Sequence, residues 1–413
     1  MLSFTTANQS WLLLIVLLSI GLLLAKVTEG PRIPDVAAYL VAGIVLGPQV
    51  LGVIHEPAAT QMNQWILMFG AVMILFDGGR HVALSILRET WLTVVMLATL
   101  GVLLTAGTVA VVAHLVFGGS LLLALLLGSV VASTDPATLI PVFRRVPVVA
   151  RLQQTLEAES AFNDATAAVL FSTLAYAASG HVITWTSVVS SFMFSAGIGV
   201  LSGAAVAALG ILVISTTRFG VLREYSSVVF LMVAMASYQV ASVLQGSGFM
   251  AAFVAGLLVG NAKPLHVPIA ALTEQHAEHF FHAITLIFRI IIFTLLGTQV
   301  QFHDMVQNFG GLLLLVLVLM LVARPITVFV CVTSDRKAKF TLRERLFMSW
   351  VRETGVLPAA LSGILLVEHV PWSHRIAAVT FLAILLTIII QATSMPWIAD
   401  KLSLTVHEVE EEI

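Results

Sequence analysis

Two short polar motifs interrupt an otherwise apolar chain. They are Ser-Thr-Asp-Pro at residues 133–136 and Glu-Ser-Ala-Phe-Asn-Asp at residues 159–164. On a helix, Ser160 and Asp164 lie four residues apart and share one face, while Asn163 lies on the adjacent face. Carboxylate, amide and hydroxyl oxygens are hard ligands that suit a dehydrated alkali cation and not a transition metal. The spacing therefore predicts a cation site lined by oxygen atoms.

The first motif predicts a break in a helix. Pro136 lacks a backbone donor and disfavours helical backbone at Asp135. Such an interruption could bring Thr134 and Asp135 to the cavity that Asp164 faces. A second break is predicted about 219 residues later, in Thr-Gly-Val-Leu-Pro at 354–358. Two helices interrupted at matching places indicate a transport site near the middle of a membrane.

Composition places both motifs in a membrane. The chain has 413 residues, of which 59% are hydrophobic and 10% charged, whereas soluble domains carry about 25% charged residues. The mean hydropathy of +1.02 is spread over the whole chain, which excludes a soluble enzyme with one anchor and argues against an outer-membrane barrel. A net charge of -2 implies no nucleic-acid partner, and the single cysteine, Cys331, excludes an internal disulfide and a thiolate metal cluster.

A membrane-crossing helix needs about 20 residues. Apolar segments bounded by charges or by Gly and Pro then predict an all-α polytopic protein with about 13 transmembrane helices. Residues 1–10 lack the basic start of a signal peptide, so the first segment is read as an uncleaved span. The short ninth span and the long seventh span, which could contain a break, are the hardest to place. The predicted spans are 11–27, 35–54, 63–79, 90–117, 119–144, 153–179, 184–214, 222–243, 247–262, 280–300, 309–332, 344–367 and 373–399.

The distribution of Lys and Arg predicts the orientation. With the N-terminus outside, the inner loops and span ends hold sixteen Lys and Arg residues, and the outer side holds only Arg375. Such an asymmetry supports the span count and an inside C-terminus. We expect a transporter domain over residues 1–402 and a short acidic cytoplasmic tail over 403–413, with no sizeable regulatory domain.

An internal repeat is also visible. Residues 40–47, Leu-Val-Ala-Gly-Ile-Val-Leu-Gly, resemble residues 253–260, Phe-Val-Ala-Gly-Leu-Leu-Val-Gly, at an offset of 213. Because the two segments belong to spans two and nine, they cross the membrane in opposite directions. Spans 1–6 and 8–13 are therefore expected to form the inverted repeats typical of secondary transporters. The alternative is that Gly-x-x-x-Gly patterns are ordinary packing motifs of membrane helices.

Ionisable side chains within a bilayer cost about 2.5–3.5 kcal/mol each and are functional hypotheses by default. We interpret Asp164 as functional, because the spans contain too few arginines to neutralise every acid. Glu159 is more simply explained as the structural partner of an arginine. The remaining charged residues taken to lie within the spans, away from their ends, are Asp135, Arg289, Arg324, Arg352 and Glu353, with Asp77 near the inner end of span three as a borderline member.

Together these residues resemble the NhaP/NHE type of monovalent cation/proton antiporter. The resemblance rests on the two polar motifs, on Leu-Phe-Asp-Gly-Gly at 75–79, on the two Ala-Gly patterns and on Ala-Arg-Pro at 323–325. It covers nearly the whole chain. It implies an inverted-repeat antiporter fold with two interrupted crossing helices.

The resemblance implies a role for each site residue. Asp164 would bind either the cation or the proton, and Asn163 would support the unwound backbone. Thr134, Ser160 and Asp135 would complete the site, in which Asp164, Ser160 and Thr134 hold the alkali cation. Asp77 would have a supporting role. It occupies a position where the family commonly has Glu, and it would act through water or on access to the site.

The sequence departs from the family pattern in span twelve. The family usually reads Trp-x-Gly-x-Arg-Gly, whereas residues 350–355 read Trp-Val-Arg-Glu-Thr-Gly. The resemblance implies that Glu159 pairs with an arginine of span twelve, and either Arg352 or Arg289 could take this place. Glu353 is an additional acid beside the site, and it leaves the ion preference open.

The predicted mechanism is competition for one carboxylate. Burial raises the pKa of an acid because desolvation disfavours its charged form, so a proton and a cation exclude each other at Asp164. With Asn163 in place of a second Asp, the resemblance implies electroneutral exchange of one Na⁺ or K⁺ for one H⁺ by alternating access. It also implies a multi-pass protein of the bacterial inner membrane, surrounded by lipid, homodimeric and without a cofactor.

Two other classes are considered. A sodium-coupled solute symporter of similar architecture would need a roomy cavity for an organic substrate. An intramembrane enzyme is disfavoured, because the chain has no HExxH, GxSxG or GxxxxGK[ST] motif, although Asp135 and Asp164 could imitate an aspartyl dyad. The Glu and His residues between 274 and 282 are expected to form a solvated loop, with a metal site or pH sensor as the alternative.

Overall fold

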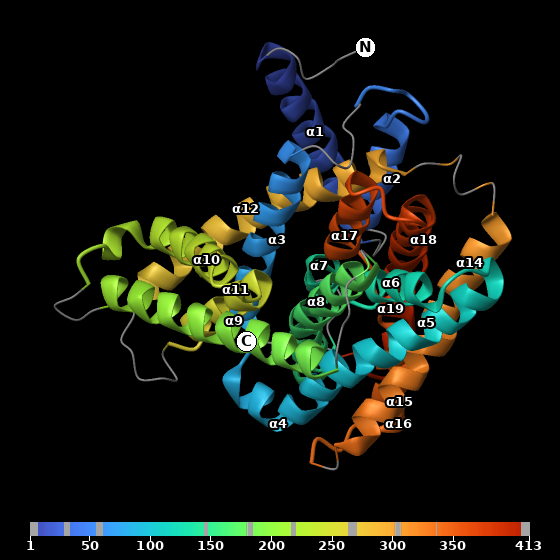
Figure 1. Cartoon of the computed structure of the whole chain (residues 1–413). Coiled ribbons are helices and arrows are strands. Elements are labelled where there is room, and N and C mark those ends of the chain that lie inside the picture. Colours follow the sequence, from blue (N-terminus) through green and yellow to red (C-terminus); the bar gives the residue numbers. More distant parts are fainter. Residues whose placement is uncertain are drawn as a thin grey trace.

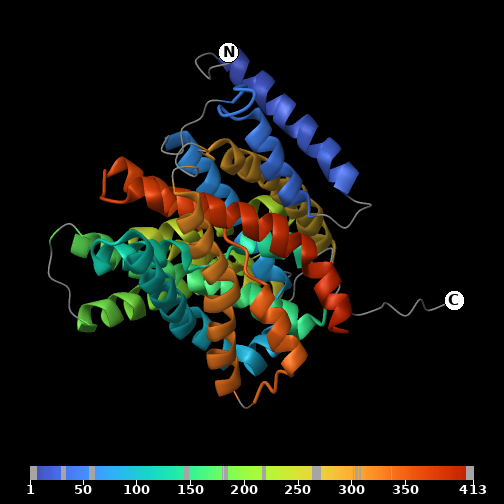
Figure 2. The same cartoon turned by 90° about the vertical axis from the view of Figure 1, so that its right-hand side faces the viewer.

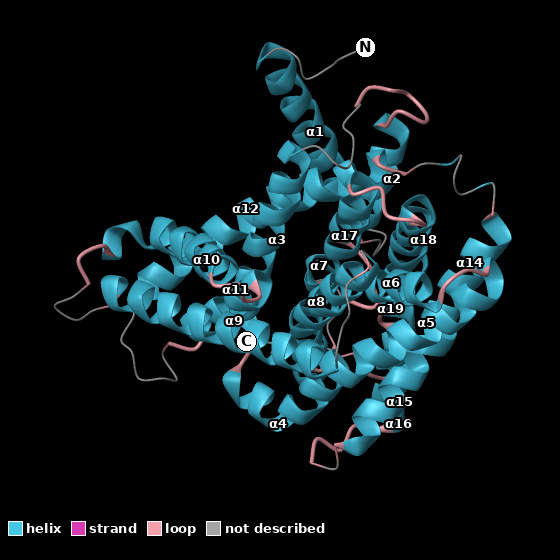
Figure 3. Ribbon diagram, viewed as in Figure 1, coloured by secondary structure: helices cyan, strands magenta, loops and turns pink. Residues whose placement is uncertain are grey.

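The computed structural model describes residues 7–28, 34–54, 61–143, 148–178, 180, 185–215, 220–262, 271–300, 302, 306, 308–335 and 337–405. Over these residues the chain is helical apart from turns, and the only β pairing is an isolated bridge between Val148 and Thr405 (Figure 3). The predicted all-helical fold is therefore confirmed. Most of the predicted acidic tail, residues 406–413, lies outside the described residues.

The first half of the chain contains eight α-helices in the described residues. A π-helical segment, Leu97–Gly101, joins α4 to α5, so that residues 84–117 form one continuous rod. This rod begins six residues before the predicted start of span four at residue 90. The helices are α1 (Ala7–Thr28), α2 (Asp35–Leu46), α3 (Gln61–His81), α4 (Leu84–Met96), α5 (Val102–Phe117), α6 (Leu121–Val131), α7 (Pro136–Phe143) and α8 (Ala150–Ala178).

The second half has π-helical segments at Leu319–Ala323 and Thr387–Ala392 and a short 3₁₀ turn at Arg223–Tyr225. The seventh predicted span is one unbroken helix, α9. The predicted loop before span ten is wrong, because residues 271–279 already belong to helix α12. The helices are α9 (Trp185–Ile214), α10 (Ser226–Val243), α11 (Gly248–Gly260), α12 (Ala271–Thr298), α14 (Phe309–Val318), α15 (Arg324–Ser334), α16 (Leu342–Trp350), α17 (Val356–Val367), α18 (Ser373–Leu386) and α19 (Thr393–Lys401).

Six helical rods among the described residues are long and apolar enough to cross a membrane, and five shorter apolar helices accompany them. Their apolar side chains stay partly exposed at the surface, as expected for helices that face lipid. The chain is therefore an integral membrane protein. The six rods are Leu84–Phe117, Val189–Ile214, Arg223–Val243, Glu278–Thr298, Phe309–Ser334 and Ser373–Lys401.

The helices gather on two sides of the molecule. In Figure 1, α9, α10 and α11 lie on one side and α5, α6, α14 and α15 on the other, with α3, α7 and α8 between them. After a 90° turn, Figure 2 shows the C-terminal helices α14 to α19 in orange and red on the face toward the viewer. The largest group of buried apolar side chains lies among α2, α3, α5 to α8, α12 and α14 to α19, and a smaller one lies among α3 and α9 to α12.

Glycines of the two repeated segments allow close helix pairs. An added Cβ at Gly43 of α2 would overlap the backbone oxygen of Thr294 in α12, and one at Gly256 of α11 would overlap that of Phe76 in α3. Small residues at membrane-helix contacts let the backbones approach in this way. Both Ala-Gly patterns therefore lie at close helix contacts.

One acid outside the spans anchors the loop after α15. The Asp335 carboxylate accepts hydrogen bonds from Thr93 Oγ1 (2.9 Å), from Thr93 N (3.2 Å) and from the backbone N–H groups of Lys337 (3.0 Å) and Ala338 (3.1 Å). Burial disfavours the charged carboxylate, but these hydrogen bonds outweigh it and lower the pKa of Asp335. The loop is thereby attached to α4.

Candidate cation site at two helix breaks

The first break lies between α6 and α7. Helix α6 ends at Val131, residues 132–135 are not helical, and α7 begins at Pro136. Asp135 starts α7, because its backbone oxygen accepts from Thr138 N (3.2 Å) and its Oδ2 accepts from Thr138 Oγ1 (2.7 Å). A carboxylate at a helix N-terminus is stabilised by the helix dipole. Pro136 is favoured at the first helical position of α7, because the backbone N–H that proline lacks would have no intrahelical partner there.

Helix α8 supports the first break through side chains. Thr134 N donates to Asn163 Oδ1 (3.3 Å), and Asn163 Nδ2 donates to Thr134 Oγ1 (2.7 Å). Thr134 Oγ1 in turn donates to Ser160 Oγ (3.0 Å). Asn163 thus satisfies backbone and side-chain groups that the break leaves free. The structure brings Thr134, Ser160 and Asn163 into one hydrogen-bonded cluster.

Asp164 lies one residue beyond this cluster and is 4% exposed. Its Oδ1 atom has no hydrogen-bond partner among the described residues, and neither has the buried Oγ of Ser133. The negative charge of Asp135 is close enough to repel that of Asp164. A buried carboxylate with an unpartnered oxygen is costly, so this arrangement favours binding of a proton or a cation at Asp164.

The second break lies between α16 and α17. Residues 351–355 are not helical, and Glu353 O accepts a hydrogen bond from Asp135 N (2.9 Å), which joins the two breaks. Thr354 N donates to Thr387 Oγ1 (3.1 Å). A Cβ added at Gly355 would overlap Oδ2 of Asp135. Only glycine therefore fits at position 355 without moving the Asp135 side chain.

Arg352 lies in the second break and donates hydrogen bonds to backbone oxygens of the first. Its guanidinium donates to the backbone oxygens of Val131 and Ala132 (3.2 Å) and to Thr354 Oγ1 (3.0 Å). The last carbonyls of a helix have no intrahelical partner, and a cation near them is favourable. Arg352 is thus the cap of α6 and does not pair with Glu159.

The predicted partner of Glu159 is wrong. Arg324, the first residue of α15, donates from Nη1 to Glu159 Oε1 and from Nη2 to Oε2 (2.9 Å). Its Nε donates to the backbone oxygens of Met348 (3.0 Å) and Val351 (3.1 Å) at the end of α16. Glu159 is therefore paired with an arginine, but that arginine comes from the Ala-Arg-Pro motif at 323–325. That motif was recognised in the sequence without a role.

Arg289 and Asp77 lie away from the two breaks. Arg289 Nη1 is 3.6 Å from Asp35 Oδ2, at the beginning of α2. Asp77 lies near the end of α3, where Arg80 Nη1 donates to its Oδ1 (3.0 Å). Within the described part of the chain, these ion pairs join Arg289 to Asp35 and Asp77 to Arg80, and neither pair includes Asp164. Arg289 is thus a partner of α2 and not of Glu159.

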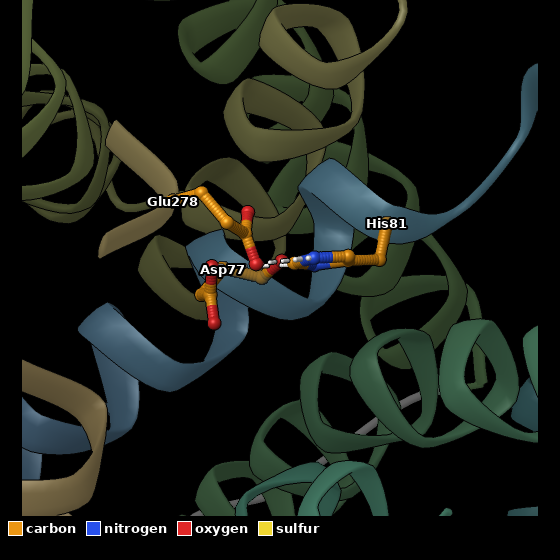
Figure 4. Close-up of side chains that lie close together, drawn as sticks. All are labelled: Asp77, His81 and Glu278. Carbon is orange, nitrogen blue, oxygen red and sulfur yellow. Dashed lines mark hydrogen bonds and ion pairs between the residues drawn. The ribbon is translucent and has the colours of Figure 1, made fainter. Parts of the chain in front are cut away.

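Asp77 belongs to a second polar cluster with His81 and Glu278 (Figure 4). The ligand atoms of these three residues lie within 4.8 Å of one another, and the His81 ring Nε2 is 3.3 Å from Glu278 Oε1. Arg80 already donates to both Asp77 and Glu278. Because the Arg80 guanidinium already binds one oxygen of each acid, we assign no metal to this cluster.

A cleft of about 800 Å³ lies between α8, α9, α10 and α11. Its lining runs along α8 from Tyr176 to Ala165, the residue that follows Asp164. Hydroxyl and amide side chains such as Ser172, Ser195 and Gln245 line it, and none of its described lining residues is charged. The cleft thus reaches the residue that follows Asp164 in the sequence.

Apolar helices that break around a buried acid define a secondary transporter. A family model described as sodium/hydrogen exchanger, transmembrane, matches residues 13–401. The chain belongs to this family.

Known relatives agree with this assignment. The K⁺/H⁺ antiporter NhaP of Alkalimonas amylolytica is 28% identical over 403 residues, which are 97% of this chain and 68% of that protein. The Na⁺/H⁺ antiporter 1 of Methanocaldococcus jannaschii is 28% identical over 93% of this chain and 94% of its own length. The structure of the sodium proton antiporter MjNhaP1 from the same organism matches with a TM-score of 0.81 and 27% identity, over 96% of this chain and 98% of that one. The resemblance to the NhaP/NHE type is confirmed.

Proposed function

We propose that this protein exchanges one Na⁺ or K⁺ for one H⁺ across the membrane, electroneutrally, at Asp164. The observation that carries the proposal is the buried Oδ1 of Asp164, which has no partner among the described residues and lies beside a cluster of hydroxyl and amide oxygens. The named relatives support it, since they are described as Na⁺/H⁺ and K⁺/H⁺ antiporters. An enzymatic activity is not part of the proposal.

Competition at Asp164 explains the exchange. In its ionised form, the carboxylate holds an alkali cation together with the oxygens of Thr134 and Ser160. Protonation removes the charge, so the cation leaves. Asn163 keeps Thr134 in place on the broken backbone, and Asp135 orders the start of α7 and adds negative charge to the site.

The proposed architecture has thirteen spans, with spans 1–6 and 8–13 as inverted repeats over residues 1–402. In such a repeat, span two corresponds to span nine and span three to span ten. The proposal is supported by the packing of α2 on α12 and of α11 on α3, which are equivalent pairs under this correspondence. The hydrogen bonds at the two helix breaks also support this proposal. A side chain of α8 binds Thr134 N, and Thr387 at the end of α18 binds the equivalent Thr354 N.

Alternating access would follow if one helical group moves against the other. The group of α9 to α11 and the group around α5 to α8 and α14 to α19 meet beside Asp164, at the cleft that ends at Ala165. Asp77 would then influence access from the end of α3. The remaining parts of the proposal are a bacterial inner membrane, an outside N-terminus, a cytoplasmic C-terminus with residues 403–413 as a short tail, and a homodimer.

The test is exchange in proteoliposomes that contain a pH-sensitive dye, with Na⁺, K⁺ and Li⁺ offered in turn. Asp164→Asn cannot ionise, so cation-driven proton movement should fall to the level of protein-free vesicles. Asp400→Asn, the same change at an exposed position near the end of α19, should leave the rate unchanged. Substantial exchange by Asp164→Asn would refute the assignment.

A further inference from the structure

Glu353 is a buried acid that the proposed exchange does not use. It lies in the second break, it is 1% exposed, and neither oxygen of its carboxyl group has a hydrogen-bond partner among the described residues. Its backbone oxygen accepts from Asp135 N (2.9 Å), so it lies where the two breaks meet. We propose that Glu353 keeps a proton of its own throughout the cycle, while Asp164 alone exchanges proton for cation. This inference rests on the proposed function.

The neighbouring arginines, Arg324 and Arg352, donate their hydrogen bonds to groups other than the Glu353 carboxyl. Arg324 directs both terminal nitrogens at Glu159 and its Nε at carbonyls of α16. Arg352 donates to carbonyls of α6 and to Thr354. The charged groups near Glu353 are these two arginines and Asp135, which acts at a distance. An ionised Glu353 would therefore be a buried charge without hydrogen bonds, which is strongly unfavourable.

The charge at Asp164 leads to the same conclusion. In the proposed exchange, one monovalent cation or one proton at Asp164 neutralises that carboxylate in each of the two loaded states. An ionised Glu353 would leave a buried negative charge in each of them, which a second cation or proton would have to balance.

The retained proton therefore sets the stoichiometry. With Glu353 neutral, the break carries one exchangeable charge, and exchange of one cation for one proton moves no net charge. If Glu353 were to ionise during transport, it would carry a second proton and make exchange electrogenic. Glutamine is neutral and similar in shape to protonated Glu, so Glu353→Gln imitates the proposed state.

Two measurements test the inference. In proteoliposomes, Glu353→Gln should exchange within about threefold of wild type, which corresponds to less than about 1 kcal/mol, and neither protein should respond to a voltage-clamping ionophore. In infrared spectra taken with saturating Na⁺ or K⁺, where Asp164 is ionised, wild type should show the carbonyl stretch of a protonated carboxylic acid. Glu353→Gln should lose this band, and Glu368→Gln, at an exposed position after α17, should keep it.

Several outcomes would overturn the inference. They are voltage-sensitive exchange that becomes insensitive in Glu353→Gln, loss of exchange in folded Glu353→Gln, or an infrared band that Glu353→Gln leaves unchanged. If Glu353→Gln does not fold, Glu353→Asp keeps the acid and should shift the band without removing it; an unshifted band contradicts the proposal. The spectra need no transport, so failure of wild type to exchange cations would refute the proposed function and leave the Glu353 result intact.

Discussion

At the residue scale, four buried acids with the same chemistry have different surroundings. Glu159 is paired with Arg324 by two hydrogen bonds. Asp135 begins a helix and accepts from Thr138. Asp164 and Glu353 lack hydrogen bonds to one or both carboxyl oxygens within the described part of the chain. Only the last two therefore have a strong reason to take up a proton or a cation.

Breaking the Glu159 pair should destabilise the protein. Glu159→Gln removes one charge and leaves the Arg324 guanidinium buried and uncompensated, which costs about 3–5 kcal/mol. The free energy of unfolding in detergent, measured by thermal or chemical denaturation, should fall by this amount. Glu89→Gln is the matched control, because Glu89 is half exposed and pairs with Arg151; surface pairs contribute about 0–1 kcal/mol. Equal losses in the two variants would show that the buried pair is not structural.

At the element scale, each helix break provides hydrogen-bond partners for backbone groups of the other. Arg352 of the second break caps α6 of the first, and Glu353 O binds Asp135 N. Each break frees backbone groups that lipid cannot satisfy. Neither break is therefore stable alone, and a change at one should disturb the other.

Gly355→Ala tests this dependence. The new Cβ would overlap Oδ2 of Asp135, so the Asp135 side chain must move away from its hydrogen bond with Thr138, at a cost of about 1–3 kcal/mol. We expect a lower melting temperature and a large loss of exchange in proteoliposomes. Gly107→Ala in α5 meets nothing within 4 Å and should retain both. Wild-type exchange by Gly355→Ala would show that contact between the breaks is not required.

Local features of the site could be predicted from the sequence, whereas its long-range pairs could not. Pro136 and the spacing of Ser160, Asn163 and Asp164 indicated a break beside a polar helix face, because these effects act within a few residues. The partner of Glu159 is 165 residues away in sequence, and it depends on how α8, α15 and α16 pack. The missing family arginine in 350–355 suggested Arg352, which instead caps α6.

At the scale of the whole molecule, close helix pairs join segments that are far apart in the sequence. The α2–α12 and α3–α11 pairs have Gly43 and Gly256 at their contacts, where an added Cβ would overlap the backbone of the partner helix. Small residues at such contacts let helix backbones approach directly. We expect each pair to move as one unit in the proposed rocking of one helical group against another.

The single cysteine allows the orientation to be tested. Cys331 is buried in α15, and Cys331→Ala gives a cysteine-free background. Glu368→Cys lies in the turn before α18 and Lys337→Cys in the turn after α15, and both positions are exposed. Because basic residues gather on the cytoplasmic side, a membrane-impermeant maleimide added to intact cells should label Glu368→Cys and leave Lys337→Cys unlabelled until the cells are opened. The reverse pattern would invert the proposed topology, and with it the side from which the cleft at Ala165 opens.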